Sequence, residues 1–205
     1  MYPAIEHQAS TGAGQVTLAF PADLRRRLDL YISQCDYEIS GLGTVESRNG
    51  ILVVSGLYLL DQQVTEGSTN LSSLAVAKFL AEAPQLGVDV NKVRLWWHSH
   101  AKFDTYWSTA DEEAIDSFKS APWFVSVVGN HAGQYLTRVD LFPTPTIPFR
   151  LSQKAELTTV YVREELKSVR EEISKRVHRA EPTTVIGRRT RARTRITALQ
   201  PASSG

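Results

Sequence analysis

The chain has 205 residues and a formal net charge of +1, with 42% hydrophobic and 22% charged residues. This length suits one domain with an appendage, and the composition is ordinary for a soluble globular protein. The single cysteine, Cys35, excludes an intramolecular disulfide and a cysteine-based zinc site. No apolar run reaches the roughly 18 residues of a membrane span, and the N-terminal residues do not predict a signal peptide. We therefore expect a cytoplasmic protein with no membrane partner.

The charge is unevenly distributed along the chain. Residues 182–205 contain five arginines and no acidic residue, which leaves a net charge of −4 for residues 1–181. Low apolar content predicts that this basic tail is mostly disordered. Arginines without interleaved aromatic residues are a weak signal for nucleic acid, so we expect no nucleic-acid partner.

The first predicted elements are a strand and a helix. Residues 1–15 are small and polar and predict a flexible lead-in, whereas Val16 to Phe20 predicts a short strand. Pro21 suits the first turn of a helix, where its missing N–H costs nothing. The apolar residues that follow recur at helical spacing: Leu24, Leu28, Tyr31 and Cys35. Cys35 is accordingly predicted to be a buried core residue rather than a reactive thiol.

A hairpin is predicted next, because the pair Asn49-Gly50 separates two strand-like runs. Residues 61–70 are polar and predict a loop, and residues 71–83 predict a helix. Residues 92–100 predict a strand.

The last part of the domain is predicted to contain a helix that begins at Ser108 and strands at 123–128 and 134–141, joined by a tight turn. Three prolines in residues 142–148 are expected to end the compact domain. The order of elements predicts an α+β (α/β-like) fold with a mixed sheet.

Beyond the domain expected over residues 16–150, the C-terminal segment 151–181 predicts a helix. Its narrow apolar stripe comprises Ala155, Thr159, Val162, Leu166, Val169 and Ile173. Such a stripe suits packing on the core and also suits pairing with a second copy, so a homodimer through this helix is one of two alternatives.

Two histidines end the predicted strand 92–100, His98 and His100. Side chains at i and i+2 of a strand share a face, so the two rings can bind one metal ion. A catalytic zinc site has three protein ligands and leaves the fourth position to water. Asp111 supplies the third ligand if the chain turns back after the strand. Asp104 is the alternative third ligand, although we expect it to be a solvated turn residue.

Ser108 and Asp111 also have a purely structural interpretation. Ser-x-x-Asp before a helix resembles a capping box, in which the serine caps the helix and the acid reaches back. The two interpretations are compatible, because a helix that begins at Ser108 presents Asp111 in its first turn, facing the end of the strand.

The complete pattern H-x-H-x7-S-x2-D, from His98 to Asp111, resembles the zinc signature of the JAMM metalloproteases, the MPN-plus (JAB) domain family. The patterns of metallo-β-lactamases and cupins fit less well, and a helical H-E-x-x-H is absent. The resemblance covers about residues 16–142. It implies an MPN/cytidine-deaminase-like catalytic domain, a mixed β-sheet flanked by helices.

The resemblance also implies a set of roles. His98, His100 and Asp111 would hold one zinc ion per chain, and Ser108 would steady the tetrahedral intermediate. Glu38, in the stretch EISGLG, would be the general acid/base, although by itself it suggests a surface acid. The implied activity is cleavage after the C-terminal glycine of ubiquitin or a ubiquitin-like protein, in deconjugation or precursor processing.

Two departures from the family point to a compact prokaryotic member. Eukaryotic members often have proline where this chain has Ala101, and the turn at Gly129–Gly133 leaves no room for a longer insertion. Trp107 would line the groove for a substrate tail. Two alternatives stay open at this point: maturation of a sulfur-carrier ubiquitin-like protein, and a non-catalytic scaffold.

Overall fold

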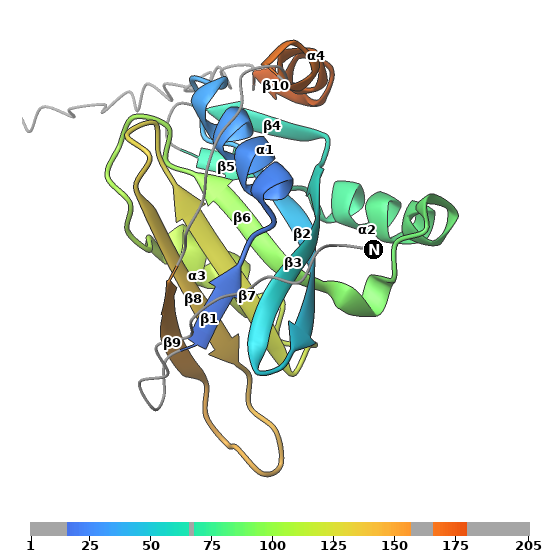
Figure 1. Cartoon of the computed structure of the whole chain (residues 1–205), viewed down its shortest axis with the longest axis vertical. Coiled ribbons are helices and arrows are strands. Elements are labelled where there is room, and N and C mark those ends of the chain that lie inside the picture. Colours follow the sequence, from blue (N-terminus) through green and yellow to red (C-terminus); the bar gives the residue numbers. More distant parts are fainter. Residues whose placement is uncertain (1–15, 66–67, 157–165, 180–205) are drawn as a thin grey trace, which may run out of the picture.

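The computed structural model describes residues 16–65, 68–156 and 166–179 (Figure 1). The expected lead-in, residues 1–15, and the basic tail, residues 182–205, lie outside the described residues. In chain order the elements are β1 (Val16–Ala19), α1 (Ala22–Ser33), β2 (Ser40–Arg48), β3 (Ile51–Leu59), β4 (Gln62–Thr65), β5 (Ser68–Asn70), α2 (Ser73–Glu82), η1 (Ala83–Leu86), η2 (Val90–Lys92), β6 (Val93–Ser99), α3 (Thr109–Asp116), β7 (Trp123–Gly129), β8 (Tyr135–Leu141), β9 (Leu151–Glu156), α4 (Leu166–Arg176) and β10 (Val177–Arg179).

Strands of the main sheet close into a barrel in the order β1-β3-β2-β6-β7-β8-β9. β1 completes the barrel because it pairs in parallel with β3 at Leu18–Leu52 and with β9 at Val16–Ala155. The expected MPN/cytidine-deaminase-like mixed sheet flanked by helices is therefore wrong. Hydrophobic patterns predict strands but not their partners. Here the partner that closes the barrel, β9, lies at the other end of the domain.

The C-terminal segment also differs from the single helix expected over residues 151–181. Its first residues form β9, antiparallel to β8, and α4 begins at Leu166, followed by β10. The apolar stripe expected of the helix has a single residue in this stretch, Ala155, which does not distinguish a strand from a helix. Pairing with both β8 and β1 favours the strand. The proline-containing residues 142–148 consequently connect two barrel strands.

The polar residues 61–70 were expected to form a loop, but they contribute β4 and β5 to a small sheet of order β10-β4-β5. β10 joins this sheet in parallel with β4, so the end of the described chain returns to the first half. Val64 anchors β4 because its side chain is fully buried in the core. One apolar residue in a polar run gives too weak an alternation to predict a strand.

Two local expectations, the hairpin turn and the strand before the motif, are confirmed. Asn49 and Gly50 both have positive φ, 51° and 79°, as a type I′ hairpin turn requires between β2 and β3. The strand expected over residues 92–100 is β6, which contains His98, ends one residue before His100, and pairs with β2 and β7. Among the described residues, no helix combines the length and apolar character needed to cross a bilayer.

Alternate residues of β6 enter two separate hydrophobic clusters. Leu95 and Trp97 belong to the larger cluster, which α1 covers with Leu28 and Tyr31. Trp96 belongs to the second cluster, to which α3 contributes Ile115. The second cluster also includes partly buried residues of α2.

α4 packs against the larger cluster through Val169, which is fully buried. Its Glu172 accepts hydrogen bonds from Tyr31 Oη and Arg27 Nη2 of α1, at 2.7 and 2.5 Å. The helix therefore packs on the core, and a homodimer through it stays a prediction. The helix lies beside α1 at one end of the molecule (Figure 1).

Candidate metal centre

The two histidines lie together at the end of β6. His98 is 1% exposed and His100 is 4% exposed, and their Nε2 atoms are 3.3 Å apart. The rings therefore share one face, as the alternation of the strand predicts.

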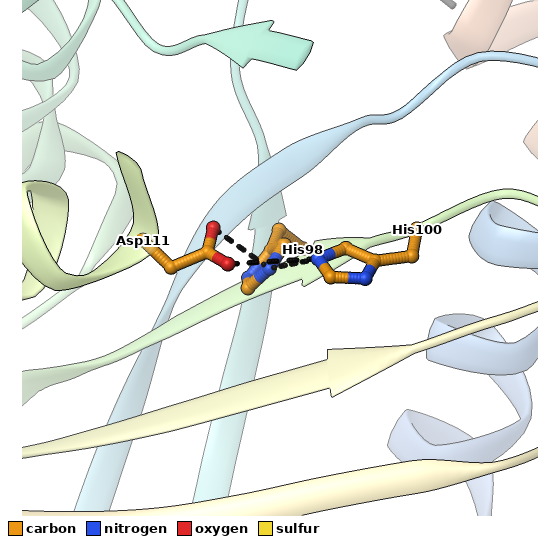
Figure 2. Close-up of side chains that lie close together, drawn as sticks. All are labelled: His98, His100 and Asp111. Atoms are coloured by element: carbon orange, nitrogen blue, oxygen red, sulfur yellow. Dashed lines mark hydrogen bonds and ion pairs between the residues drawn. The ribbon is translucent and has the colours of Figure 1, made fainter. Parts of the chain in front are cut away.

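Asp111 meets the histidines from the first turn of α3 (Figure 2). Its Oδ1 lies 3.1 Å from His98 Nε2, and its Oδ2 lies 3.5 Å from His100 Nε2. The predicted capping box is confirmed: Ser108 Oγ accepts from the Asp111 N–H, and the Ser108 N–H donates to Asp111 Oδ2. Ser108 Oγ also donates to that oxygen at 2.7 Å. Helix capping thus aims the carboxylate at the histidines.

The spacing of these three side chains fits a metal ion. Zinc ligands lie about 2.0–2.2 Å from the ion in a tetrahedral arrangement, so two ligand atoms of one ion are about 3.3 Å apart. The two histidine Nε2 atoms, 3.3 Å apart, match that value. Asp111 approaches each histidine through a different oxygen: Oδ1 lies 3.1 Å from His98 Nε2 and Oδ2 lies 3.5 Å from His100 Nε2. His98, His100 and Asp111 are thus a buried group that could hold a metal ion.

The two rings differ in what orients them. His100 Nδ1 donates to the Asp104 carbonyl oxygen at 2.9 Å, an outer contact typical of metal-binding histidines. Asp104, the alternative third ligand, thus contributes its main chain, and its side chain is exposed as expected of a turn residue. Among the described residues, His98 Nδ1 has no hydrogen-bond partner, and its ring stacks on Trp96 at 4.2 Å.

Burial and mutual contacts shift the ionisation of the group. Burial lowers the pKa of His98, which favours the neutral ring that binds a metal. Burial would raise the pKa of Asp111, but hydrogen bonds with His100 and His98 hold it well below its usual range. The pKa of His100 is raised: burial lowers it, but contacts with Asp111 and the Asp104 carbonyl, and the charge of Glu38, outweigh that effect.

Glu38 reaches this group from a different part of the chain, the connection between α1 and β2. It lies two residues before β2 begins, close to the strand start that was expected. The carboxyl is half-buried, and burial raises its pKa, while the charges of His100 and Asp111 act on it in opposite directions. Its electrostatic interaction with both residues places the Glu38 carboxyl near the candidate metal group.

Gly41, three residues after Glu38, has a clear structural reason. A Cβ at this position would overlap the Tyr58 carbonyl oxygen and lie 2.5 Å from the Trp97 ring. The glycine therefore lets the indole of Trp97 lie across β2, where its Nε1 donates to the Leu42 carbonyl at 3.2 Å.

Aromatic side chains surround the histidines. Trp107, predicted to contact substrate, is half-buried, with its ring centroid 5.9 Å from that of His98. Sequence analysis missed its neighbour Tyr106, which is 55% exposed and meets the His100 ring edge-on at 4.8 Å. The signal available in the sequence was an aromatic residue between the histidine pair and Ser108.

An ionic network, also missed, ties α3 to the barrel. Arg138 of β8 donates to both carboxylate oxygens of Glu112, at 2.5 and 2.8 Å, and to Asp140 at 3.0 Å. Its guanidinium lies 4.6 Å from the centroid of the Trp107 ring. Because Glu112 follows Asp111 in the first turn of α3, the network helps to place the ligand.

No model of a known protein family matches the sequence, and no curated protein matches it. The interpretation of the site therefore rests on its own residues. They are a buried group of two histidines and one aspartate that could hold a metal ion, and a half-buried glutamate near it.

Proposed function

We propose that this protein is a zinc-dependent protease of the JAMM type, an isopeptidase or peptidase that cleaves after the C-terminal glycine of ubiquitin or a ubiquitin-like protein. The observation that carries the proposal is the meeting of Glu38 with the group His98, His100 and Asp111. Three metal ligands and a separate carboxylate are the parts that hydrolysis of an amide bond requires.

The donor set fits zinc, because neutral imidazole and carboxylate oxygen are both zinc ligands. A zinc ion held there would supply Lewis acidity and lower the pKa of a bound water toward about 7. Glu38 would accept a proton from the attacking water and return it to the leaving amine. Its raised pKa suits both steps, because a base works best when its pKa lies closer to the ambient pH.

Ser108 has two tasks in this proposal. In the structure its hydroxyl donates to Asp111 Oδ2 and so orients the ligand. Donation to a developing oxyanion would require the hydroxyl to rotate away from Asp111, and the Ser108 N–H would then remain on the carboxylate.

Two histidines and one carboxylate also suit ferrous iron in oxygenases. Glu38 favours hydrolysis over that alternative, because a half-buried carboxyl that interacts electrostatically with His100 and Asp111 could supply a general base. Metal analysis of the purified protein separates the two: the proposal requires one zinc per chain.

The substrate class rests on the resemblance of the motif to the JAMM family. An exposed aromatic residue beside the centre supports an extended peptide as the substrate: Tyr106 is 55% exposed and contacts the His100 ring. The partners would be ubiquitin-like proteins and their conjugates.

Glu38→Gln tests the proposal directly. We expect one zinc per chain to remain, while kcat for a ubiquitin-like fusion falls by about 100- to 10,000-fold. The matched control is Asp36→Asn, which removes an exposed carboxylate two residues away and should leave kcat unchanged. A zinc-loaded wild type that cleaves no member of a broad panel of ubiquitin-like fusions and conjugates contradicts the proposal.

The panel also separates the alternatives. Cleavage of a sulfur-carrier precursor extended beyond its Gly-Gly tail, without cleavage of any conjugate, would assign the protein to sulfur-carrier maturation. A non-catalytic scaffold would cleave neither substrate.

A further inference from the structure

Ser99, the residue between the two histidines, binds the segment that carries Glu38. It is fully buried, and the alternation of β6 turns it away from the metal ligands. Its Oγ accepts from the Ile39 N–H at 3.1 Å, and its N–H donates to the Ile39 carbonyl at 2.8 Å. One residue of the histidine motif thus binds both main-chain groups of the residue after Glu38.

This contact extends the pairing of two strands by one residue. The ladder between β2 and β6 ends at Ser40 and His98, and Ile39 faces Ser99 just beyond it. A side-chain hydroxyl serves there as the acceptor for the Ile39 N–H. Ile39 is fully buried, so loss of the hydroxyl would leave its N–H without this partner in a place that water does not reach.

Gln62 holds the next residue in the same way. Its Oε1 accepts from the Ser40 N–H and its Nε2 donates to the Ser40 carbonyl, both at 2.8 Å. Gln62 is 4% exposed. The two residues that follow Glu38 are therefore held by side chains from two other parts of the chain.

His131 holds the same segment on the other side of Glu38. Its Nε2 donates to the Cys35 carbonyl at 2.9 Å, while its main-chain N–H donates to the Ala101 carbonyl at 2.8 Å. The turn after His100 and the residues before Glu38 are thus linked through one residue.

We propose that Ser99 is a positioning residue. Its hydroxyl holds the segment that carries Glu38 in register with His98 and His100, the two proposed metal ligands on either side of Ser99. The effect expected on kcat rests on the proposed hydrolytic function. The structural part of the inference, control of the Glu38 segment through Ile39, can be measured without a substrate.

Ser126 provides a matched control for this inference. It is also a fully buried serine in the barrel, on the adjacent strand β7, paired with Trp96. Among the described residues its Oγ has no hydrogen-bond partner. Ser126→Ala therefore removes a buried hydroxyl from the same sheet without removing a hydrogen bond.

The experiment compares Ser99→Ala, Ser99→Thr and Ser126→Ala as zinc-loaded full-length proteins. We expect Ser99→Ala to retain one zinc per chain and an unchanged KM, while kcat falls by about 10- to 100-fold, because a displacement of about 1 Å at a reacting group can cost that much. Ser99→Thr keeps the hydroxyl and should recover most of kcat, and Ser126→Ala should match the wild type.

Hydrogen exchange of the Ile39 amide, measured by NMR, gives a readout that does not depend on activity. Ser99→Ala should lose protection at Ile39 and keep it at Leu95 in the middle of β6, whereas Ser126→Ala should keep both. Unchanged Ile39 protection in Ser99→Ala, a wild-type kcat in that variant, or loss of its zinc would each overturn the inference. If the wild type cleaves nothing, the proposed function fails, and Ile39 protection alone then decides whether Ser99 positions the segment.

Discussion

The two faces of strand β6 have different surroundings, as its adjacent residues Trp96 and Trp97 show. Trp97 stacks on Tyr31 of α1 at 5.3 Å, within an apolar cluster. Trp96 stacks on His98 at 4.2 Å, beside the metal centre. The same strand therefore contributes one face to the hydrophobic core and the other to the candidate metal group, and substitutions on the two faces should separate stability from metal binding.

Trp97→Ala should have the largest effect, on stability. It removes a fully buried indole from the larger cluster, and such truncations cost about 3–5 kcal/mol. Urea denaturation of the metal-free protein measures the change. A loss below about 1 kcal/mol would contradict the view that this face of β6 carries the core.

His98→Leu sharpens the comparison on the other face. The substitution removes a buried ring whose Nδ1 has no partner among the described residues and keeps apolar volume against Trp96. Leucine also leaves Asp111 Oδ1 without its partner His98 Nε2, which lies 3.1 Å away. The unfolding free energy of the metal-free protein should therefore fall by about 1–3 kcal/mol, while zinc binding is lost. Denaturation and zinc titration measure the two effects, and a larger stability loss than for Trp97→Ala would reverse the comparison.

Arg138→Leu should affect both properties. It leaves the fully buried Asp140 with Arg150 and Ser152 as partners and frees Glu112 from its paired hydrogen bonds. We expect about 3 kcal/mol of lost stability and a roughly tenfold lower zinc affinity, because α3 loses its tie to the barrel. Arg94→Leu, on the other side of the sheet from these acids, is the control. Unchanged zinc affinity in Arg138→Leu would show that the network does not place Asp111.

The pH dependence of zinc binding follows from His100. Its pKa is raised above 6.5, so a proton occupies the ring at higher pH than in a free histidine. Zinc affinity should therefore fall about tenfold per pH unit once the pH drops below the raised pKa.

In the metal-free protein the same shift stabilises the fold below pH 6.5, and this contribution is lost as pH rises through the raised pKa. Zinc titration from pH 5 to 8 measures the first effect, and a flat profile would contradict it; His178→Gln, an exposed histidine in β10, should leave it unaltered.

Ala101→Gly should have the smallest effect. Ala101 has φ of 43°, a left-handed conformation that costs a residue with a Cβ about 1 kcal/mol or more. The glycine variant should gain about 1 kcal/mol in urea denaturation and keep its zinc affinity. Ala101→Pro should be strongly destabilised because proline holds φ near −65°. The positive φ at this position is therefore incompatible with proline.

Local patterns predicted much of the metal group. The alternation of β6 placed His98 and His100 on one face, and the capping box placed Asp111 in the first turn of α3. Both rules act within a short segment, so they hold in many tertiary environments. Tyr106, Arg138 and the outer contact of the Asp104 carbonyl were not predicted, because each depends on how loops and strands pack.

The sequence by itself determined the strand, the turn back and the capped helix that bring the three ligand side chains together. Only the tertiary structure closed the sheet into a barrel through β1 and β9 and brought Glu38 close enough to act electrostatically on His100. The physical reason is the range of the interactions: alternation and capping depend on neighbours in sequence, whereas strand pairing depends on which distant segments bury surface together.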